Sequence, residues 1–467
     1  MKNRLVKFIS LFLSVLTAVL CISCTGGGTS TSSTPTSSKP ADSSGEQPES
    51  LPLTVEYGIA DQSNLYGICY HMEGNFYWGS PFTNEDIPID VQLIANLGAK
   101  TVRHWMHCVN LMKDVNTINE EACESLHIAL SECENHGIIN IGMNHHNFNE
   151  GVSSVGKLAR NMTKGSDYIK WLDDYYTTWY NLVKEFPEVQ YWEIDNELNN
   201  PDFMYNAYDK SYFTAEQMAD ISTDMLYYAT RAIHDANPDA KSVMGGLTEP
   251  MGFGYGDVSK SKPTNVWFLQ RIYDNIFSGE YGYFYGKESD EMASINPDDY
   301  FDVVSYHPYI WERTPISESY FIAESHKLYQ VVLDNEQKHK KVFITEVGFT
   351  EYYRGAEVVG ESIRRMYHAI STAMPYVETV NLFKLYDIAT EAWSGAEGDN
   401  GMERYGLFYD FNPEREYYML DLKNPTEHTS ELCIPGAPKP YAYIFQEIAG
   451  GSGLLTLMKN YYRNKTE

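Results

Sequence analysis

The sequence predicts an α/β protein with a single (β/α)8 TIM barrel, and two observations support this prediction. Short apolar runs rich in strand-forming residues alternate with longer amphipathic stretches from residue 53 to about residue 450. Such alternation is typical of parallel strands joined by helices. Eight runs of each kind spread over about 400 residues fit one barrel with long loops.

Each predicted strand is an apolar or β-branched run that ends at polar residues. The predicted strands are 65–70, 101–104, 138–143, 188–195, 241–245, 301–306, 341–345 and 377–385. The predicted helices have apolar residues at helical spacing, and several end at glycine or before proline. They are 87–97, 120–136, 167–186, 215–237, 266–277, 319–337, 357–374 and 441–448.

Four long segments follow predicted strands, and loops in such positions line the catalytic face of a barrel. They are 200–214, 248–264, 279–299 and 387–438.

The alternative architecture is a doubly wound open sheet. The first predicted strand is not followed by a glycine-rich phosphate loop, which counts against a nucleotide-binding version of that sheet.

Residues 1–24 predict an export signal, because positively charged residues precede the apolar run 8–22. Cys24 follows that run directly after the small residue Ser23. This arrangement resembles a bacterial lipoprotein signal, although Cys21 stands where such signals usually carry leucine. We therefore expect lipid attachment at Cys24, and an ordinary cleaved signal peptide is the alternative.

Residues 25–52 are rich in Ser, Thr, Gly and Pro and nearly lack apolar side chains. This composition predicts a flexible linker in front of one domain that spans residues 53–467. No later apolar run is long enough to span a membrane. We expect an exported protein that is either secreted or held at a bacterial cell surface through a lipid anchor alone.

The composition restricts the partners of this chain. The sequence has 35 Lys and Arg residues against 64 Asp and Glu residues, which gives a formal net charge of −29. Such a surface repels phosphates, and no basic cluster offsets it, so we expect no nucleic acid partner. A neutral or a cationic partner remains compatible, and polysaccharide is neutral. The acidity mainly keeps an exported protein soluble.

The cysteines do not predict a zinc site, because no CxxC pair occurs beyond the signal. Cys123 and Cys133 are expected on one helix at a separation that prevents a disulfide bond. Cys69 and Cys108 follow neighbouring predicted strands and can pair, but buried free thiols are favoured for them. Cys433 completes the set.

Polar side chains collect at the ends of the predicted strands, which converge on one face of a barrel. They are Arg103, His145, Asn196, Glu197, His307, Tyr309 and Glu346. Glu197 follows the fourth predicted strand and Glu346 follows the seventh, so the two carboxylates should face one another across the barrel mouth. Two carboxylates placed in this way can break a glycosidic bond.

Three motifs carry a resemblance to a known group of enzymes. They are Trp192-Glu-Ile-Asp-Asn-Glu197, Asp302-Val-Val-Ser-Tyr-His-Pro-Tyr309 and Ile344-Thr-Glu-Val-Gly-Phe349. In this order and at these strand ends, the chain resembles clan A glycoside hydrolases and is nearest to families 39 and 5. The resemblance implies a retaining (β/α)8 enzyme that cleaves β-glycosidic bonds of a plant-type or other polysaccharide or oligosaccharide, and no cofactor is expected.

The resemblance also implies roles for the motif residues. Glu197 matches the general acid/base, and Glu346 matches the nucleophile that forms a covalent glycosyl-enzyme. Asn196 matches the asparagine that binds the sugar 2-hydroxyl group.

Four further residues are expected to support this pair. Arg103 matches an arginine beside the nucleophile, where a fixed cation favours the ionised carboxylate. Tyr309, ahead of His307, is expected to contact the nucleophile and the sugar. Glu193 shares the parity of Glu197 on the same strand and is expected to bond Arg103 in a structural role.

The chain departs from the pattern of these families at three places. Asp195 stands where members usually carry Trp, and the eighth predicted strand lacks the usual Trp platform for sugar. Trp393 or Tyr386 is expected to replace that platform. The tail after Gly450 is too short for the β-sandwich that family 39 enzymes often add, so xylan, glucan and mannan all remain open as substrates.

Histidines near two strand ends have weaker assignments. No carboxylate at ligand spacing accompanies His145 and His146, so we expect substrate-binding or structural histidines and no metal site. His145 is the one expected to bind substrate. His104, Trp105 and His107 are equally consistent with the wall of the site and with a structural role.

Two alternative functions use the same scaffold. A non-catalytic carbohydrate-binding surface lipoprotein is disfavoured, because Asn196, Glu197 and Glu346 are all present. A transglycosylase would use the same three residues with a sugar acceptor in place of water, and the sequence does not separate it from a hydrolase.

Overall fold

The structure is a computed structural model in which one of two units of the chain is described. The chain divides into Met1–Pro52 and Leu53–Glu467, and every described residue belongs to the second unit. The described residues are 60–70, 76–77, 80–81, 84–148, 155–248, 263–283, 293–310, 314–351, 354–387, 404–409, 418–420, 428–432 and 437–454. The predicted signal and linker, Cys24, Trp393 and Cys433 lie outside them.

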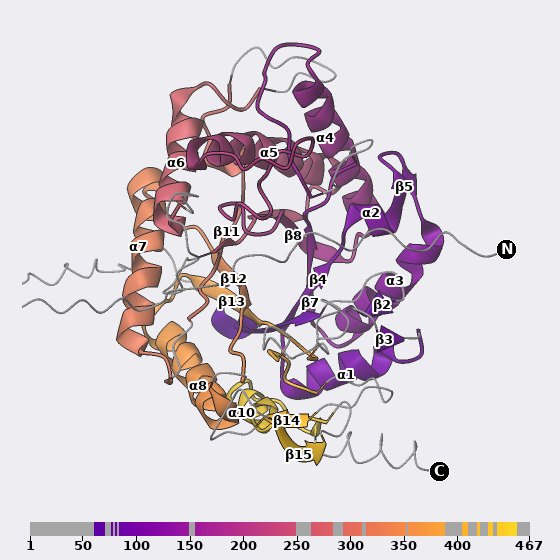
Figure 1. Cartoon of the computed structure of the whole chain (residues 1–467), viewed down its shortest axis with the longest axis vertical. Helices are drawn as coiled ribbons and strands as arrows, with labels where there is room; N and C mark the ends of the chain where they lie inside the picture. Colours follow the sequence, from indigo (N-terminus) through magenta and orange to yellow (C-terminus); the bar gives the residue numbers. More distant parts are fainter. Residues whose placement is uncertain are drawn as a thin grey trace, which may run out of the picture. The chain divides into compact units, whose positions relative to one another are not determined.

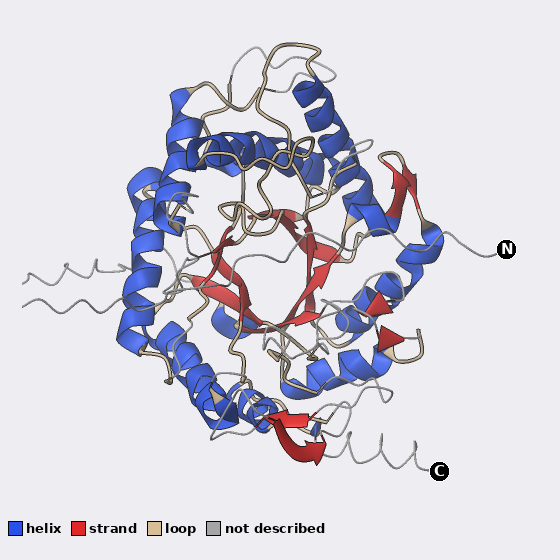
Figure 2. Cartoon of the chain, in the orientation of Figure 1, coloured by secondary structure: helices blue, strands red, loops and turns tan. Residues whose placement is uncertain are grey.

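Within the described residues, nine parallel strands form one sheet in the order β10-β11-β12-β13-β1-β4-β7-β8-β9. They are β1 (Tyr66–Tyr70), β4 (Thr101–Trp105), β7 (Ile139–Asn144), β8 (Val189–Ile194), β9 (Lys241–Met244), β10 (Leu247–Thr248), β11 (Val304–His307), β12 (Val342–Val347) and β13 (Val377–Leu382). Figure 2 shows these strands as a red ring inside the helices.

The two ends of this sheet are β9, which lies within the fifth predicted strand, and β10, which follows it and was not predicted. β9 pairs with β8 on one side, and β10 pairs with β11 on the other. A parallel bridge from Val243 to Val303 also joins β9 to the residues just before β11. The ring is therefore closed, and the predicted (β/α)8 barrel is confirmed.

Glycine is needed where the fifth strand is interrupted. Gly245 and Gly246 separate β9 from β10. A Cβ atom at Gly246 would lie only 2.1 Å from His307 Nε2. The missing side chain therefore lets this backbone approach the catalytic face of the barrel closely.

Eight long helices of the described residues surround the strands (Figure 1). They are α1 (Ile87–Leu97), α3 (Glu120–Asn135), α4 (Asp167–Glu185), α5 (Ala215–Ala236), α6 (Asn265–Ser278), α7 (Glu318–Glu336), α8 (Gly355–Ala373) and α10 (Pro440–Ile448). Local signals set their ends. Thr214 and Gln217 form a capping box at the start of α5, and Gly98 ends α1 with φ of 89°.

No helix among the described residues is both long and apolar enough to cross a membrane.

The predicted helices all occur within two residues of their expected bounds, but the strand ends differ. β11 begins at Val304 and includes His307, which was expected after the strand. Glu346 likewise lies inside β12, whereas Arg103 lies inside β4 as predicted. The prediction that His307 and Glu346 follow their strands was wrong, because the strands stay paired up to the barrel mouth while alternate side chains point inward.

Several short elements were not predicted. They are α2 (Cys108–Leu111), the pairs β2 (Phe76–Tyr77) with β3 (Ser80–Pro81), β5 (Met112–Asp114) with β6 (Thr117–Ile118) and β14 (Tyr418–Leu420) with β15 (His428–Leu432), and the 3₁₀ turns η2 (Gln62–Asn64) and η4 (Pro297–Asp299). They contain too few residues for a periodic pattern to form.

The barrel interior changes from apolar to polar toward the catalytic face. Ile141, Val243 and Phe343 come from β7, β9 and β12 and pack together, so they fill the interior. Tyr191 of β8 packs against this cluster. Two residues further along β8 the inward side chain is Glu193, which begins a polar layer above the apolar one.

The described cysteines are buried free thiols. Cys69, Cys108, Cys123 and Cys133 form no disulfide bond with one another. The favoured expectation for Cys69 and Cys108 is therefore confirmed, and they act as small apolar residues of the barrel core.

Candidate active site

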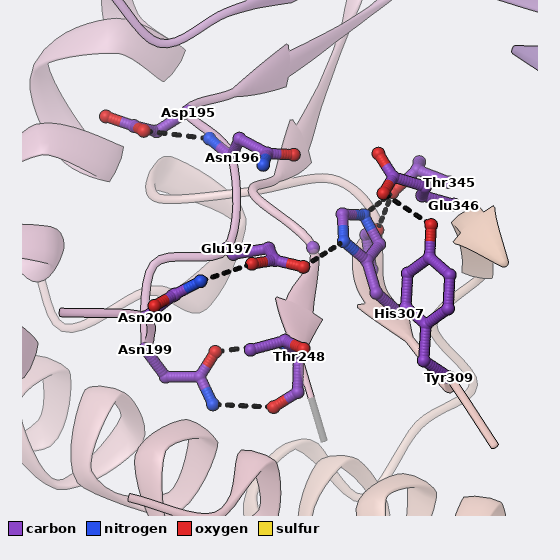
Figure 3. A network of polar contacts seen from close by, with 12 residues as sticks. Asp195, Asn196, Glu197, Asn199, Asn200, Thr248, His307, Tyr309, Thr345 and Glu346 are labelled. Atoms are coloured by element: carbon purple, nitrogen blue, oxygen red, sulfur yellow. Dashed lines mark hydrogen bonds and ion pairs between the residues drawn. The ribbon is translucent and has the colours of Figure 1, made fainter. Parts of the chain in front are cut away.

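Glu197 lies just beyond β8, where the backbone turns sharply. Asp195 and Glu197 both have positive φ angles, 69° and 47°, which residues other than glycine seldom adopt. The Glu197 carboxylate accepts a hydrogen bond of 2.6 Å from Asn200 Nδ2 and lies 3.3 Å from His307 Nδ1. Figure 3 shows Glu197 held between these two side chains.

Glu346 is held by two donors, one from β4 and one from the segment that follows β11. The Tyr309 hydroxyl group donates a hydrogen bond of 2.6 Å to one oxygen, and Arg103 Nη1 donates one of 2.8 Å to the other. Both contacts were expected from the sequence. The positive charge of Arg103 therefore lies directly against the Glu346 carboxylate, as in a charge-assisted hydrogen bond.

The two carboxylates face one another across a short gap. One oxygen each of Glu197 and Glu346 and a ring nitrogen of His307 all lie within 4.8 Å of one another. The Glu197 and Glu346 side chains are 13% and 10% exposed, so both are largely enclosed yet reach solvent. A glycosidic bond between them would meet one carboxylate as a nucleophile at its anomeric carbon and the other as a proton donor at its oxygen.

A third carboxylate, Glu193, supports this pair from within the barrel. It is fully buried, and it accepts hydrogen bonds of 2.5 Å from Arg103 Nε and 2.8 Å from Thr345 Oγ1. Arg103 Nη2 donates a third bond, of 2.9 Å, to Asn196 Oδ1. One guanidinium thus fixes Glu193, Asn196 and Glu346 relative to one another, and the expected bond from Glu193 to Arg103 is confirmed.

Buried charged neighbours lower the pKa of Glu193 and raise the pKa of His307. Burial raises the pKa of Glu193, but the charge of Arg103 and the interactions with His307 together outweigh it and lower that pKa to about 2. Burial lowers the pKa of His307, but its interactions with Glu193 and Glu197 outweigh it and raise that pKa to about 9. His307 is therefore a charged group between two carboxylates at neutral pH.

Replacing His307 by glutamine is expected to remove a pH-dependent part of the stability. Because folding raises the pKa of His307, its contribution is complete below the unfolded pKa of about 6.5 and is lost as the pH rises through 9. Between these two pH values the free energy of unfolding of the wild type should fall by about 3 kcal/mol relative to that of His307→Gln. Urea unfolding of both proteins across this range checks the result, and parallel pH profiles would contradict it.

Asp195, whose role the sequence left open, is a structural partner of Lys157. Its side chain points away from Glu197 and Glu346 in Figure 3. It forms an ion pair with Lys157 Nζ, and both side chains are fully buried. Burial raises the pKa of Asp195, and the Lys157 charge opposes that rise. The pair anchors the loop carrying Lys157 to the end of β8.

Replacing Lys157 by methionine is expected to lower the free energy of unfolding by about 3–5 kcal/mol, because Asp195 would keep a buried charge without a counter-charge. Adding Asp195→Asn to this variant should restore part of the loss. Urea unfolding of the single and double variants measures both effects. Lys170→Met, which breaks an exposed pair with Asp167, is the control and should cost less than about 1 kcal/mol.

His145 lies in a histidine cluster rather than against the two catalytic candidates. Its ring stacks on His107 with centroids 4.2 Å apart and lies 4.3 Å from the ring of His146. Phe203 covers it at 5.4 Å. Burial lowers the pKa of His145 well below its usual range and lowers that of His146 to about 2, so both are neutral at neutral pH.

The aromatic residues near Glu346 are not those expected. Tyr386 is buried and donates a hydrogen bond of 2.6 Å to Asp90 of α1, so its expected role as a sugar platform is wrong. Tyr405 instead meets Tyr309 edge-on with ring centroids 6.1 Å apart, and Phe383 packs against Tyr405 at 5.6 Å.

Comparisons with known proteins support the fold. No protein-family model matches the chain, and no curated protein matches it either. A family 39 glycoside hydrolase from the gut symbiont Bacteroides cellulosilyticus WH2 aligns with a TM-score of 0.50 at 15% identity over 84% of this chain and 64% of its own. This chain thus spans less than two thirds of that enzyme.

Two further solved structures match over most of both chains. A family 1 β-glucosidase from Thermotoga maritima aligns with a TM-score of 0.52 at 14% identity, covering 85% of this chain and 99% of its own. GH5_18 from Streptomyces cattleya, in complex with GlcNAc, has a TM-score of 0.52 at 13% identity, covering 83% and 80%. The chain therefore has the (β/α)8 barrel fold that is found in glycoside hydrolases of families 39, 1 and 5.

Proposed function

We propose that this protein is a retaining glycoside hydrolase that cleaves β-glycosidic bonds by double displacement. One observation carries the proposal, namely that Glu197 and Glu346 face each other within 4.8 Å in different surroundings. Carboxyl groups about 5–5.5 Å apart fit a retaining mechanism, whereas an inverting enzyme needs about 6.5–9.5 Å to admit a water molecule.

The different partners of the two carboxylates assign their roles. Glu346 has Arg103 and Tyr309 as donors, so its charge is stabilised and its oxygens are aimed for attack on the anomeric carbon. Glu197 has the neutral donor Asn200 on one oxygen, and the charged His307 beside the other is shared with the ionised Glu193. Glu197 is the proton donor to the leaving oxygen and, in the second step, the base that activates water.

Substrate binding is proposed for a further set of residues. Asn196 accepts a hydrogen bond from Arg103, and we assign to it the sugar 2-hydroxyl. His145 and Tyr309 are further proposed contacts, and Trp393, which lies outside the described residues, is proposed from the sequence alone. The net charge of −29 suits an uncharged polysaccharide or oligosaccharide rather than an anionic polymer.

The proposal includes the place of action. The N-terminal signal with Cys24 supports an exported protein that is anchored through lipid at a bacterial cell surface, or secreted. Either location brings the barrel into contact with extracellular glycans.

A panel of aryl β-glycosides and β-linked polysaccharides tests the reaction type. Proton NMR of the first product formed should show the β-anomer before mutarotation, because two displacements retain the configuration. The α-anomer as first product would contradict the retaining mechanism. Binding of glycans without turnover by fresh protein would favour a carbohydrate-binding lipoprotein, and products longer than the substrate would favour a transglycosylase.

A further inference from the structure

Three histidines from two neighbouring loops meet beyond the carboxyl ends of β4 and β7. His107 follows β4 and immediately precedes α2, and His145 and His146 follow β7. β4 and β7 are adjacent parallel strands, so these loops leave the barrel side by side. One ring nitrogen from each of the three histidines lies within 4.8 Å of the other two.

The backbones of the two loops are fixed to each other by Asn144. Its Oδ1 accepts hydrogen bonds from the backbone nitrogens of Cys108 and His146, at 3.0 and 3.2 Å. Its Nδ2 donates to the His146 carbonyl oxygen at 3.2 Å, and Cys108 Sγ donates to the same oxygen at 3.3 Å. The backbones that carry the histidines are thus held together by hydrogen bonds outside the cluster, while these bonds do not fix the orientations of the rings.

Two nitrogens of the cluster lack a hydrogen-bond partner. Nδ1 of His145 and Nδ1 of His146 are shielded from solvent, and no described residue bonds to either. His145 as a whole is only 7% exposed. A buried polar atom without a partner costs roughly 1–3 kcal/mol, so these two nitrogens call for a ligand that the described residues do not supply.

The positive side chains near the cluster are neutralised by carboxylates. Lys157 Nζ donates to the His145 carbonyl oxygen at 3.3 Å and is ion-paired with Asp195. Arg103 is ion-paired with both Glu193 and Glu346. The cluster therefore carries no uncompensated charge from these neighbours that would exclude a cation.

We propose that His107, His145 and His146 form a binding site for one divalent transition-metal ion of the zinc class. Imidazole nitrogens suit Zn²⁺, Cu²⁺ and Ni²⁺, whereas Mg²⁺ and Ca²⁺ prefer oxygen ligands. The His107 and His145 rings are stacked at 18°, so they must tilt apart to share an ion, while the His146 ring is already inclined to both by 48° and 37°. Three protein ligands leave a fourth position open for water or a substrate group.

Zinc titration of the full chain without substrate tests this site independently of the proposed hydrolase function. After treatment with a chelator and its removal, calorimetry should show one Zn²⁺ per chain, and excess Mg²⁺ should not compete. His107→Ala and His146→Ala should each weaken binding by at least about 10-fold. His368→Ala is the matched control, because it removes a histidine on α8 that pairs with Glu318 and should leave binding unchanged.

X-ray absorption of the zinc-loaded wild type should show three nitrogen neighbours, and circular dichroism should show that each variant is folded. Thermal melting provides a second measurement, since Zn²⁺ should raise the Tm of the wild type and of His368→Ala but not of the other variants. Failure of the wild type to bind Zn²⁺ would overturn the site. Equal binding by His107→Ala, His146→Ala and the wild type would overturn it as well.

Discussion

Replacing Glu346 by alanine is expected to lower kcat on an aryl β-glycoside by at least about 10⁴-fold, because the reaction loses its nucleophile. Sodium azide should restore part of the rate, since the small anion fits the space of the missing carboxylate. The product should then be the α-glycosyl azide, because a single displacement from that side inverts the anomeric centre. The rate and the anomer of the product are both measured directly.

Glu197→Ala is the matched variant, and its effect should depend on the leaving group. A dinitrophenyl glycoside needs little protonation, so formation of the glycosyl-enzyme should stay fast while its hydrolysis slows without the base. Azide should then give the β-glycosyl azide by attack on the intermediate. An α-azide from Glu197→Ala, or a β-azide from Glu346→Ala, would reverse the two assignments.

Replacing Arg103 by methionine is expected to lower the free energy of unfolding by about 3–5 kcal/mol at neutral pH and to abolish turnover. The substitution leaves Glu193 buried without its counter-charge and removes a donor from Glu346. Because folding lowers the pKa of Glu193 to about 2, its contribution is present above the unfolded pKa of about 4.3 and is lost as the pH falls through 2. The difference between wild type and variant should therefore shrink in acid, as urea unfolding at several pH values can show.

Two controls separate the charge of Arg103 from its shape. Arg103→Lys keeps the charge but cannot reach Glu193, Asn196 and Glu346 together, so it should be more stable than Arg103→Met yet still impaired in turnover. Adding Glu193→Gln to Arg103→Met should recover stability. A stability of Arg103→Met within about 1 kcal/mol of the wild type would contradict the account.

The sequence was sufficient for the barrel and for the positions of its two carboxylates. Strand and helix patterns are local, and the alternation of eight of each leaves few topologies. Glu197 and Glu346 could be placed on one face because parallel strands end there together. Arg103 and Tyr309 could be placed beside Glu346 only through the resemblance of the three motifs.

Contacts between distant segments could not be predicted in the same way. Lys157 precedes α4 in a stretch with no strand or helix pattern, so nothing marked it as the partner of Asp195. Thr345, which bonds Glu193, resembles any other strand residue. Asn200 is different, because three residues after Glu197 is a spacing that a turn brings back, and that signal was overlooked.

The cluster of three histidines could not be predicted for a related reason. His145 and His146 are neighbours in the sequence, and no spacing along the chain points to a third histidine. His107 follows the preceding barrel strand and joins them only because β4 and β7 are paired in register.

Trapping of the covalent intermediate tests the central claim most directly. A 2-fluoro-glycoside slows both steps, and a reactive leaving group lets the glycosyl-enzyme accumulate. Peptide mass mapping of the inactivated wild type should then place one 2-fluoroglycosyl group on Glu346. A label on Glu197, Glu193 or any other residue would contradict the assignment of Glu346 as the nucleophile.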